Sequence, residues 1–520
     1  MSNSVLSDYK TPLLFSCILI LGMFLGVKMA DQLPKQKKSE RQLDALINLI
    51  QTHYVDSLNT NLLYENGVEG ILKSLDPHTV YIPKDELQIS NEELEGSFYG
   101  IGTEFFMARD TVMISSVVTD GPASKAGIKT GDQFLKIDTA WVAGRKISQE
   151  DIVKKIRGQR ATKVKVLVRH PDSKENWITI TRDLVAYTSV TAAVKLTKET
   201  GYIAIRLFNE TTYEEFKKAL SDLKQQGISS LIIDVRNNPG GYMDAVANIA
   251  DELISGKQLL ISTKGKNEET KVYSEHPGMF ETGTLSILIN EYSASASEIL
   301  AGITQDLDRG KVYGRRSYGK GLVQEQFELP DQSAIRITTA RYYLPSGRCI
   351  QKNYADGKDE YHEDIYKRFH AGEMVHGDSS TQHKNHTPFY TKNKRTVYAN
   401  EGISPDVFIA ADTNQLNALS LFYGEHLPEQ FAFPYLYSSK RDIANVQAYD
   451  RYLMDNLAWW KDFQLFLQGR KIRIPATLEE TIKHDVMAQM ASVWYGKSGE
   501  IYFRAKSDAV IQEVLKQKGK

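Results

Sequence analysis

The sequence predicts a multidomain protein of the α/β class, with a β-rich domain before its core and helical segments near both ends. The 520 residues exceed what one hydrophobic core usually holds. Strands and helices alternate after about residue 184, while apolar residues at helical spacing mark the flanking segments. We expect five parts: an apolar segment (1–30), a helical segment (31–95), a β-rich domain (96–183), an α/β core (184–410) with a polar insert (353–400), and a helical domain (411–520).

The overall composition excludes several classes of function. The net charge is −1, from 64 Lys and Arg against 65 Asp and Glu, so no nucleic-acid partner is expected. The two cysteines, Cys17 and Cys349, form no disulfide framework, metal cluster or CxxC redox pair. Neither HExxH nor GxSxG occurs, which removes the commonest zinc-protease and α/β-hydrolase patterns. We therefore expect no metal and no cofactor.

The first thirty residues contain a targeting segment. Pro12 to Val27 carries no charge and is bounded by Lys10 and Lys28, which is the length of a signal h-region. No clean small-x-small site follows, so an uncleaved signal anchor is favoured over a cleaved signal peptide. A lipoprotein signal around Cys17 is less consistent, because most of the apolar run follows the cysteine. The basic residues that follow this segment would favour the opposite orientation: Lys28, Lys35, Lys37, Lys38 and Arg41.

The segments before the core follow two different periodicities. Leu43, Leu46, Ile47 and Ile50 share one face of a helix, and the stretch 75–78 breaks that pattern as a turn. From Gly96 onward, short runs of alternating apolar and polar residues predict half-buried strands. The β-rich domain is therefore expected to begin near this glycine.

The core shows a β–α–β pattern. Strands are predicted at 202–208, 231–235 and 285–289, with a Gly-Gly loop and helices between them. Thr212 and Glu215 have the spacing of a capping box, and Gly227 ends the same helix. This alternation predicts an α/β core.

The insert 353–400 is polar and contains five of the eleven histidines, whose spacings fit no standard metal site. A solvated insert or lid is favoured over a metal site. Beyond it, aromatic residues at helical spacing indicate a helical C-terminal core. The histidines and these aromatic residues are His362, His370, His376, His383 and His386, and Trp459, Trp460 and Phe463.

The segment from Gly121 to Asp132 combines a short helical turn with a tight glycine turn, and a strand follows. It resembles the PDZ modules of bacterial proteases, with Tyr99, Gly100, Ile101 and Gly102 at the position of their carboxylate-binding loop. Such a loop can direct backbone N–H groups at a peptide's terminal carboxylate while the peptide adds as a strand. A β-rich adaptor domain without a peptide ligand is the alternative.

Two loops carry small residues suited to a substrate site. The segment 234–241 (DVRNNPGG) is a buried strand that runs into two glycines, whose N–H groups could form an oxyanion hole. A phosphate cradle would need GxGxxG or GxxxxGK[ST], and neither pattern is present here. The segment 293–298 (SASASE) places serines where a helix begins, either as a nucleophile favoured by the helix dipole or simply as N-caps.

The segment 314–321 (GRRSYGKG) nearly matches a phosphate-binding loop, but Gly321 stands where that loop needs Ser or Thr, and a strand follows. On a strand, Lys320 and Gln324 would point to the same face. A lysine serves as a general base for a serine only when it is neutral, so burial must lower its pKa. Gln324 can orient that amine without adding charge.

In this order, the motifs resemble the carboxyl-terminal processing (tail-specific) peptidases over roughly residues 40–410. The motifs that carry the resemblance are LDPHTVY at 75–81, DVRNNPGG, SASASE, GKGxxQ at 319–324, TTARYYLPSGR at 338–348 and GISPD at 402–406. The insert 353–400 and the C-terminal hundred residues depart from this pattern.

The resemblance implies a role for each site residue. Ser295 would be the nucleophile, Lys320 the general base and Gln324 the residue that positions it. The backbone N–H groups of Ala296 and of Gly240 or Gly241 would form the oxyanion hole. It further implies a crotonase-like α/β core that follows a PDZ domain, and serine-peptidase activity on proteins with free C-termini.

The apolar N-terminal segment predicts a chain anchored in the cytoplasmic membrane. The same resemblance implies that the catalytic part faces the periplasm or the outside, against the charge bias. A homo-oligomer is compatible with it. Two rival functions remain: a non-catalytic PDZ adaptor of the cell envelope, and an acyl-CoA enzyme of crotonase fold. Hydrolysis of an unfolded protein that depends on Ser295 separates the three.

Overall fold

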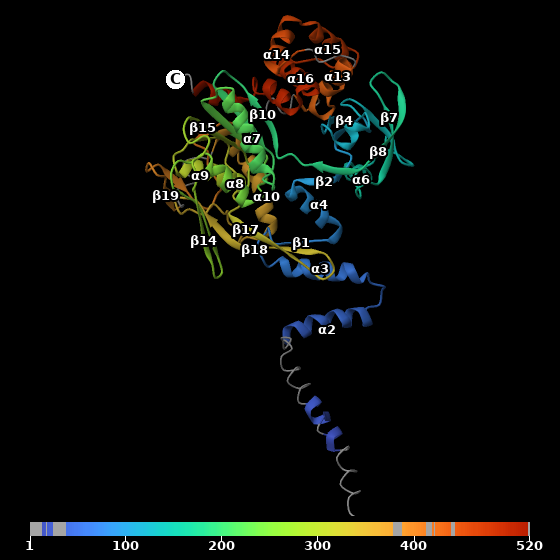
Figure 1. Cartoon of the computed structure of the whole chain (residues 1–520), viewed down its shortest axis with the longest axis vertical. Coiled ribbons are helices and arrows are strands. Elements are labelled where there is room, and N and C mark those ends of the chain that lie inside the picture. The colour runs from blue at the N-terminus through green and yellow to red at the C-terminus, as the bar shows by residue number, and fades with distance from the viewer. Residues whose placement is uncertain are drawn as a thin grey trace, which may run out of the picture. The chain divides into compact units, whose positions relative to one another are not determined.

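The computed structural model describes residues 13–16, 18–23, 38–377, 387–411, 419–420, 422–437 and 443–517. The chain divides into two compact units, Met1–Ser74 and Leu75–Lys520 (Figure 1). The second unit contains the β-rich domain, the α/β core and the C-terminal helices, so it contains every candidate site residue. The multidomain α/β class is confirmed.

The first unit contains the helices α2 (Lys38–His53) and α3 (Thr60–Leu72), as the helical periodicity predicts. Residues 13–16 and 18–23 are also helical, whereas Pro12, Cys17 and residues 24–37 lie outside the described part. No helix in the described ranges is both long and apolar enough to cross a membrane. The predicted anchor Pro12–Val27 falls only partly within these ranges.

The predicted helical segment 31–95 is not helical throughout. Val80–Ile82 forms strand β1, which pairs antiparallel with strand β18 (Ala334–Tyr343) before helix α4 (Lys84–Glu95) begins. Local periodicity could not show this pairing, because its partner strand lies far along the chain. The turn at 75–79 is thereby placed beside the core.

The β-rich domain is a twisted antiparallel sheet in the order β3-β4-β5-β7-β8, with β6 paired to β5. Alternate residues of β7 are fully buried under helix α6, as the period-two pattern predicts. Its elements are β2 (Ser97–Gly100), β3 (Thr103–Ala108), β4 (Thr111–Val117), α5 (Pro122–Lys125), β5 (Gln133–Ile137), β6 (Ala140–Trp141), α6 (Gln149–Ile156), β7 (Lys163–Arg169), β8 (Glu175–Thr181) and β9 (Asp183–Ala186).

The core sheet has the order β10-β11-β12-β15-β16-β21, antiparallel only between β10 and β11. Loops that leave the carboxyl ends of its parallel strands gather at one edge, where α/β sheets usually place their sites. The elements are β10 (Val190–Lys195), β11 (Thr200–Ile205), α7 (Thr212–Gln225), β12 (Ser230–Asp234), α8 (Met243–Asp251), β15 (Thr284–Ile289), α9 (Ala296–Asp306), β16 (Lys311–Gly314) and β21 (Val407–Phe408).

The predicted capping box of α7 is wrong by one residue. Thr211, not Thr212, is the N-cap, and its hydroxyl bonds the Glu215 carboxylate at 2.6 Å. The other oxygen of Glu215 accepts the backbone N–H groups of Ser189 and Val190 at 2.9 and 2.8 Å. Glu215 therefore ties the helix to the entry of the core instead of closing a local box.

A second sheet flanks the core and carries the strand that follows Lys320. Its order is β1-β18-β13-β14, with β17 (Leu322–Glu328) paired to β18. The remaining strands are β13 (Leu259–Gly265) and β14 (Glu269–Tyr273). The pairing of β1 and β17 with the same strand brings the turn at 75–79 next to the Lys320 loop.

The insert is not a simple solvated lid. It forms α10 (Lys358–His370), α11 (Glu373–His376), β19 (Pro388–Tyr390) and β20 (Thr396–Tyr398). Arg368 and Glu373 are buried, and Arg316 shares the Glu373 carboxylate with Arg368. His383 and His386 lie outside the described residues. In the described ranges, no group of three or more His, Cys, Asp or Glu side chains could hold a metal ion.

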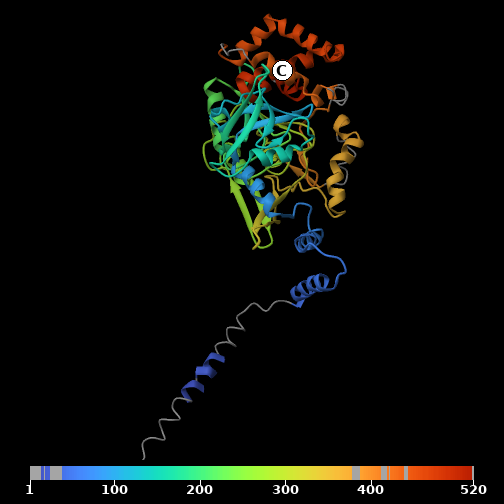
Figure 2. The same ribbon diagram turned by 90° about the vertical axis from the view of Figure 1, so that its right-hand side faces the viewer.

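The helical C-terminal part is confirmed. Its helices, coloured orange to red, gather into a layer of their own (Figure 2). Trp459, Trp460 and Phe463 are buried among them, as their helical spacing predicts. The helices are α13 (Leu427–Tyr437), α14 (Val446–Asp455), α15 (Ala458–Gln468), α16 (Glu479–Arg504) and α17 (Ala509–Gln517).

Candidate active site

Ser295 lies in the turn between β15 and α9, where it is the N-cap residue of the helix. Its backbone has φ 52° and ψ −115°, a conformation that non-glycine residues rarely adopt. Strain of this kind persists only where the surroundings impose it, and it is frequent at functional sites. The turn places a half-buried serine at the positive end of a helix dipole.

The glycine loop after β12 packs directly against this serine. Gly240 and Gly241 have φ 111° and 133°. A Cβ on Gly240 would lie 2.6 Å from the Cβ of Ser295, and one on Gly241 would lie 1.9 Å from the carbonyl oxygen of Phe208. Neither position has room for a side chain. The approach of two backbone segments therefore requires glycine at both.

The backbone N–H groups around Ser295 differ in availability. The Gly240 N–H donates to Asn238 Oδ1 at 2.8 Å, so it is already occupied. Within the part of the chain that the structure describes, the N–H groups of Gly241 and Ala296 meet no acceptor. Three N–H groups were predicted for an oxyanion hole, and of these the groups of Gly241 and Ala296 are open to a ligand.

Two asparagines fasten the glycine loop to the serine loop. The Asn237 N–H donates to Asn290 Oδ1 at 2.9 Å, and Asn290 Nδ2 returns a bond to Asn237 Oδ1 at 2.8 Å. The Asn238 carbonyl accepts the Ala294 N–H at 3.0 Å and the Ser297 hydroxyl at 2.9 Å. The motif pointed to this loop, but no local pattern showed what its asparagines bind.

Lys320 and Gln324 come together as predicted. Lys320 Nζ donates to Gln324 Oε1 at 2.7 Å, and Gln324 Nε2 donates to the carbonyl oxygen of His78. In this arrangement the Lys320 amine is bonded to Gln324 and not to the Ser295 hydroxyl. The Asp76 carboxylate fixes the turn that presents this carbonyl, because it accepts the N–H groups of His78 and Thr79 at 2.9 and 3.1 Å.

The surroundings of Lys320 lower the pKa of its amine. Burial and the positive charge of Arg336 lower the pKa of Lys320 to about 8, although the carboxylates of Glu298 and Asp76 oppose this shift. Burial and the charge of Lys320 also lower the pKa of His78 to about 3, so that the imidazole is neutral near pH 7. The lysine therefore faces a neutral imidazole and a neutral amide.

Glu298 is a buried carboxylate that joins the two loops. Its Oε2 accepts the N–H groups of Ser295 and Lys320 at 2.9 and 2.8 Å, while Oε1 accepts the Ser317 hydroxyl at 2.5 Å and the Gly319 N–H at 2.6 Å. Burial raises its pKa to about 7. Glu298 ends the SASASE motif, but no pattern in the sequence indicated a role for it.

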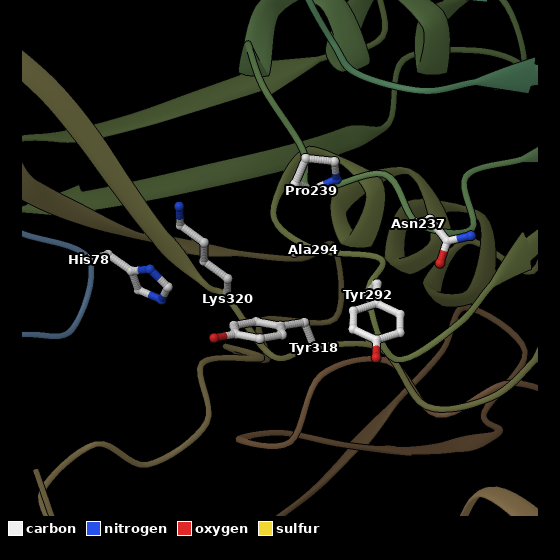
Figure 3. A pocket seen from close by; sticks show the side chains of 7 residues that line it. All are labelled: His78, Asn237, Pro239, Tyr292, Ala294, Tyr318 and Lys320. Carbon is white, nitrogen blue, oxygen red and sulfur yellow. The ribbon is translucent and has the colours of Figure 1, made fainter. Parts of the chain in front are cut away.

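A pocket of about 610 Å³ opens beside these groups (Figure 3). Both the Ser295 loop and the Lys320 loop contribute to its wall, since Tyr292 and Ala294 precede Ser295 and Tyr318 precedes Lys320. The pocket is large enough for a peptide side chain, and its wall includes Lys320 and the residue before Ser295. Its lining residues are His78, Asn237, Pro239, Tyr292, Ala294, Tyr318 and Lys320.

An ion pair joins the C-terminal part of the chain to this site. Arg236, in the glycine-loop motif, contacts Asp234 at 2.6 Å and Asp508 at 2.8 Å. Asp508 also accepts the N–H groups of Val510 and Ile511, which begin α17. Asp508 belongs to the C-terminal part, which departs from the family motifs. Through Arg236, its carboxylate holds the loop that contains Gly240 and Gly241.

The predicted carboxylate-binding loop lies at the end of strand β2. Tyr99 and Gly100 end strand β2, and Gly102 has φ 75°. In the described structure, no acceptor meets the N–H groups of Ile101 and Gly102. The strand that follows, β3, is at the edge of its sheet and leaves one side for another strand.

Comparisons with known proteins identify related families and chains. Residues 199–358 match peptidase family S41, and residues 100–180 match the PDZ domain family. The chain is 33% identical to the carboxy-terminal processing protease CtpB of Bacillus subtilis, over 61% of this chain and 67% of that protein. It is 32% identical to the carboxy-terminal-processing protease of Bartonella bacilliformis, over 64% and 79%.

Among solved structures, the photosystem II D1 C-terminal processing protease is similar at 23% identity and a TM-score of 0.37. The similarity covers 72% of this chain and 94% of that chain. The matching part of this chain spans between 64% and 79% of the length of its curated relatives.

Proposed function

Because this chain belongs to the serine peptidases of family S41, we propose that it cleaves the C-terminal tails of extracytoplasmic proteins through an acyl-enzyme on Ser295. The observation that carries the proposal is the pair of loops that Glu298 holds together. One loop presents Ser295, and the other presents Lys320, whose pKa of about 8 makes a neutral amine accessible.

In the proposed reaction, the Ser295 hydroxyl attacks the scissile carbonyl and its proton passes to the neutral Lys320 amine. Lys320 must turn from Gln324 toward Ser295 to take this proton, while Gln324 keeps the amine within reach from its fixed bond to the His78 carbonyl. The protonated amine then supplies its proton to the leaving amine. Water releases the acyl group with Lys320 again as the base.

The negative charge of the tetrahedral intermediate needs fixed donors. The open N–H groups of Gly241 and Ala296 suit this task, because Ala296 follows Ser295, Gly241 follows the glycine that packs on Ser295, and neither N–H must break an internal bond first. Gly240 contributes contact with Ser295, not a donor, since its N–H is bonded to Asn238. Ala296 also stands at the beginning of α9, where the helix dipole favours an anion.

We propose that the PDZ domain captures the free C-terminus of the substrate. The N–H groups of Ile101 and Gly102 would bind the terminal carboxylate while the tail pairs with the edge of β3. Amidation of a peptide substrate's C-terminus should then lower kcat/KM. Equal values for the acid and the amide would refute carboxylate capture and leave the peptidase proposal intact.

We further propose that Pro12–Val27 is an uncleaved anchor and that the rest of the chain lies outside the cytoplasm. The uncharged run and the family resemblance support this placement, and the basic residues that follow the run oppose it. A reporter that is active only in oxidising compartments, fused after residue 60, should be active. Cytoplasmic activity of a matched reporter would show that the charge bias decides the orientation.

The central test is hydrolysis of an unfolded protein by the full chain. Wild type should cleave it, Ser295→Ala should not, and Lys271→Ala, at an exposed lysine of β14, should behave as wild type. Absence of cleavage by wild type would favour the non-catalytic adaptor. Retained cleavage in Ser295→Ala would refute this nucleophile.

A further inference from the structure

One face of the PDZ sheet carries a row of side chains in direct cross-strand register. Trp141 on β6 lies opposite Lys136 on β5, Lys136 lies opposite Leu167 on β7, and Leu167 lies opposite Trp177 on β8. Directly paired residues project from the same side of a sheet. The opposite side of the sheet carries the domain core, so this row faces outward.

The two tryptophans are exposed to an unusual degree. Trp141 is 48% and Trp177 54% exposed, whereas Trp459 and Trp460 are 3% and 6% exposed. The ammonium of Lys136 lies 5.6 Å from the Trp141 ring centre and 5.8 Å from that of Trp177. The lysine bridges the two indoles without covering their outer surfaces.

Another part of the same sheet face is covered, which makes the exposed part more conspicuous. Phe106 on β3 lies opposite Met113 on β4, and Met113 shares a core with the C-terminal helices. The Phe106 ring stacks on His426 with 4.0 Å between ring centres, and it also approaches Phe433. The helices therefore cover the β3–β4 end, while Trp141 and Trp177 remain exposed.

Positive charge surrounds the exposed row. Lys163, Lys165 and Arg169 alternate with buried valines on β7 and are exposed on the side of Leu167. Among the strand residues of this side, Glu175 is paired with Arg169 at 2.8 Å. The Asp138 carboxylate, at the β5–β6 turn, accepts the Lys165 N–H. The lysines therefore exceed the carboxylates on this face.

This combination matches a lipid surface better than a protein surface. Protein interfaces favour tryptophan but are depleted of lysine. At a bilayer, indoles settle at the level of the headgroups, lysines extend past apolar neighbours, and basic residues are attracted to anionic lipids. We propose that the face formed by Lys136, Trp141, Lys163, Lys165, Leu167 and Trp177, the Trp face, docks on an anionic membrane surface.

The full chain, reconstituted into vesicles, provides the test. Brominated phosphatidylcholine quenches tryptophans at the depth of the bilayer interface, and the segment before residue 31 contains no tryptophan. Quenching therefore reports on the body of the protein, however the N-terminus binds. We expect quenching in vesicles that contain phosphatidylglycerol, and single Trp141→Phe and Trp177→Phe variants should assign the signal to these two indoles.

Charge variants test the role of the lysines while both indoles are retained. Lys163→Gln/Lys165→Gln should reduce quenching at least about twofold, because each basic residue contributes to binding at an anionic surface. Lys264→Gln/Lys271→Gln, on the β13–β14 hairpin of the core, is the matched control and should leave it unchanged. Quenching that is equal with and without phosphatidylglycerol would overturn the proposal.

Equal access of aqueous iodide to these indoles in detergent and in vesicles would also overturn it. Cleavage of an unfolded protein without lipid should be the same for wild type and Lys163→Gln/Lys165→Gln, because neither lysine touches the peptidase site. Failure of membrane docking is thereby distinguishable from failure of the proposed peptidase function.

Discussion

The Glu298 carboxylate accepts the backbone N–H of Ser295 at 2.9 Å from one turn further along the same helix. The same oxygen accepts the N–H of Lys320 at 2.8 Å. One buried carboxylate therefore sets the distance between the loop of the proposed nucleophile and the loop of the proposed base. Because both bonds go to backbone N–H groups, the Glu298 carboxylate occupies neither the Ser295 hydroxyl nor the Lys320 amine.

The ionisation of Lys320 should determine the pH dependence of the wild type. Only the neutral amine can accept the Ser295 proton, so kcat/KM should rise with pH through about 8, the lowered pKa of this lysine, and then level off. The kcat/KM of Lys320→Ala should be lower by several orders of magnitude and should not show this rise with pH. A profile that instead rises through the ordinary range of a histidine would contradict the assignment.

Glu298→Gln should lower kcat and shift the remaining pH profile to lower pH. The NH₂ group of the glutamine would face groups that now donate hydrogen bonds to the carboxylate. Some of these bonds would therefore be lost, and the two loops would separate. Loss of the negative charge also removes an interaction that raises the pKa of Lys320. Steady-state rates across the pH range provide the measurement, and a shift toward higher pH would be inconsistent with this role.

Arg336→Gln should shift the same profile in the opposite direction. The guanidinium disfavours the charged form of Lys320, so its removal should raise the pKa of the lysine and move the rising limb to higher pH. The present partners of the guanidinium, Ser90 and Gln326, are uncharged, so the change in charge falls on Lys320 and not on an ion pair. If the pH profiles of Glu298→Gln and Arg336→Gln coincided, neither the Glu298 nor the Arg336 charge would act on Lys320.

Gly240→Ala should abolish activity. Its new Cβ would lie 2.6 Å from that of Ser295, in a backbone region that L-residues adopt only with strain. Gly227→Ala is the matched control, because Gly227 also has positive φ but nothing within 4 Å of its Cβ position. It should cost about 1 kcal/mol of stability and retain activity. Melting temperatures and turnover of both variants decide the point.

Asp508→Asn should lower kcat roughly fivefold and leave KM little changed, because the glycine loop would be less well ordered. The loss in kcat corresponds to an increase of about 1 kcal/mol in the activation free energy. Asparagine can still cap α17, so the main loss is the charge that holds Arg236. Asn445→Ala removes the comparable cap of α14 and has no link to the site. Similar kinetic losses in both variants would indicate general destabilisation.

Much of the site could be predicted because its residues lie within short motifs. Lys320 and Gln324 are four positions apart, and the requirement for a neutral lysine follows from elementary acid–base chemistry. Three serines lie where the helix begins in SASASE, and it was the family resemblance that selected Ser295 among them. The helical ends and the β-rich domain follow from apolar periods of 3.6 and 2, which depend only on neighbouring residues.

Tertiary structure decided the contacts that span long distances in the chain. The His78 carbonyl that holds Gln324 lies 246 positions away, and the Glu298 bond to Lys320 spans 22. Asp508 reaches Arg236 only because α17 packs beside the core sheet. The sequence by itself determined which residues can do the chemistry. Folding decided which N–H groups remain open and which charges face Lys320, because those depend on burial and on the packing of separate segments.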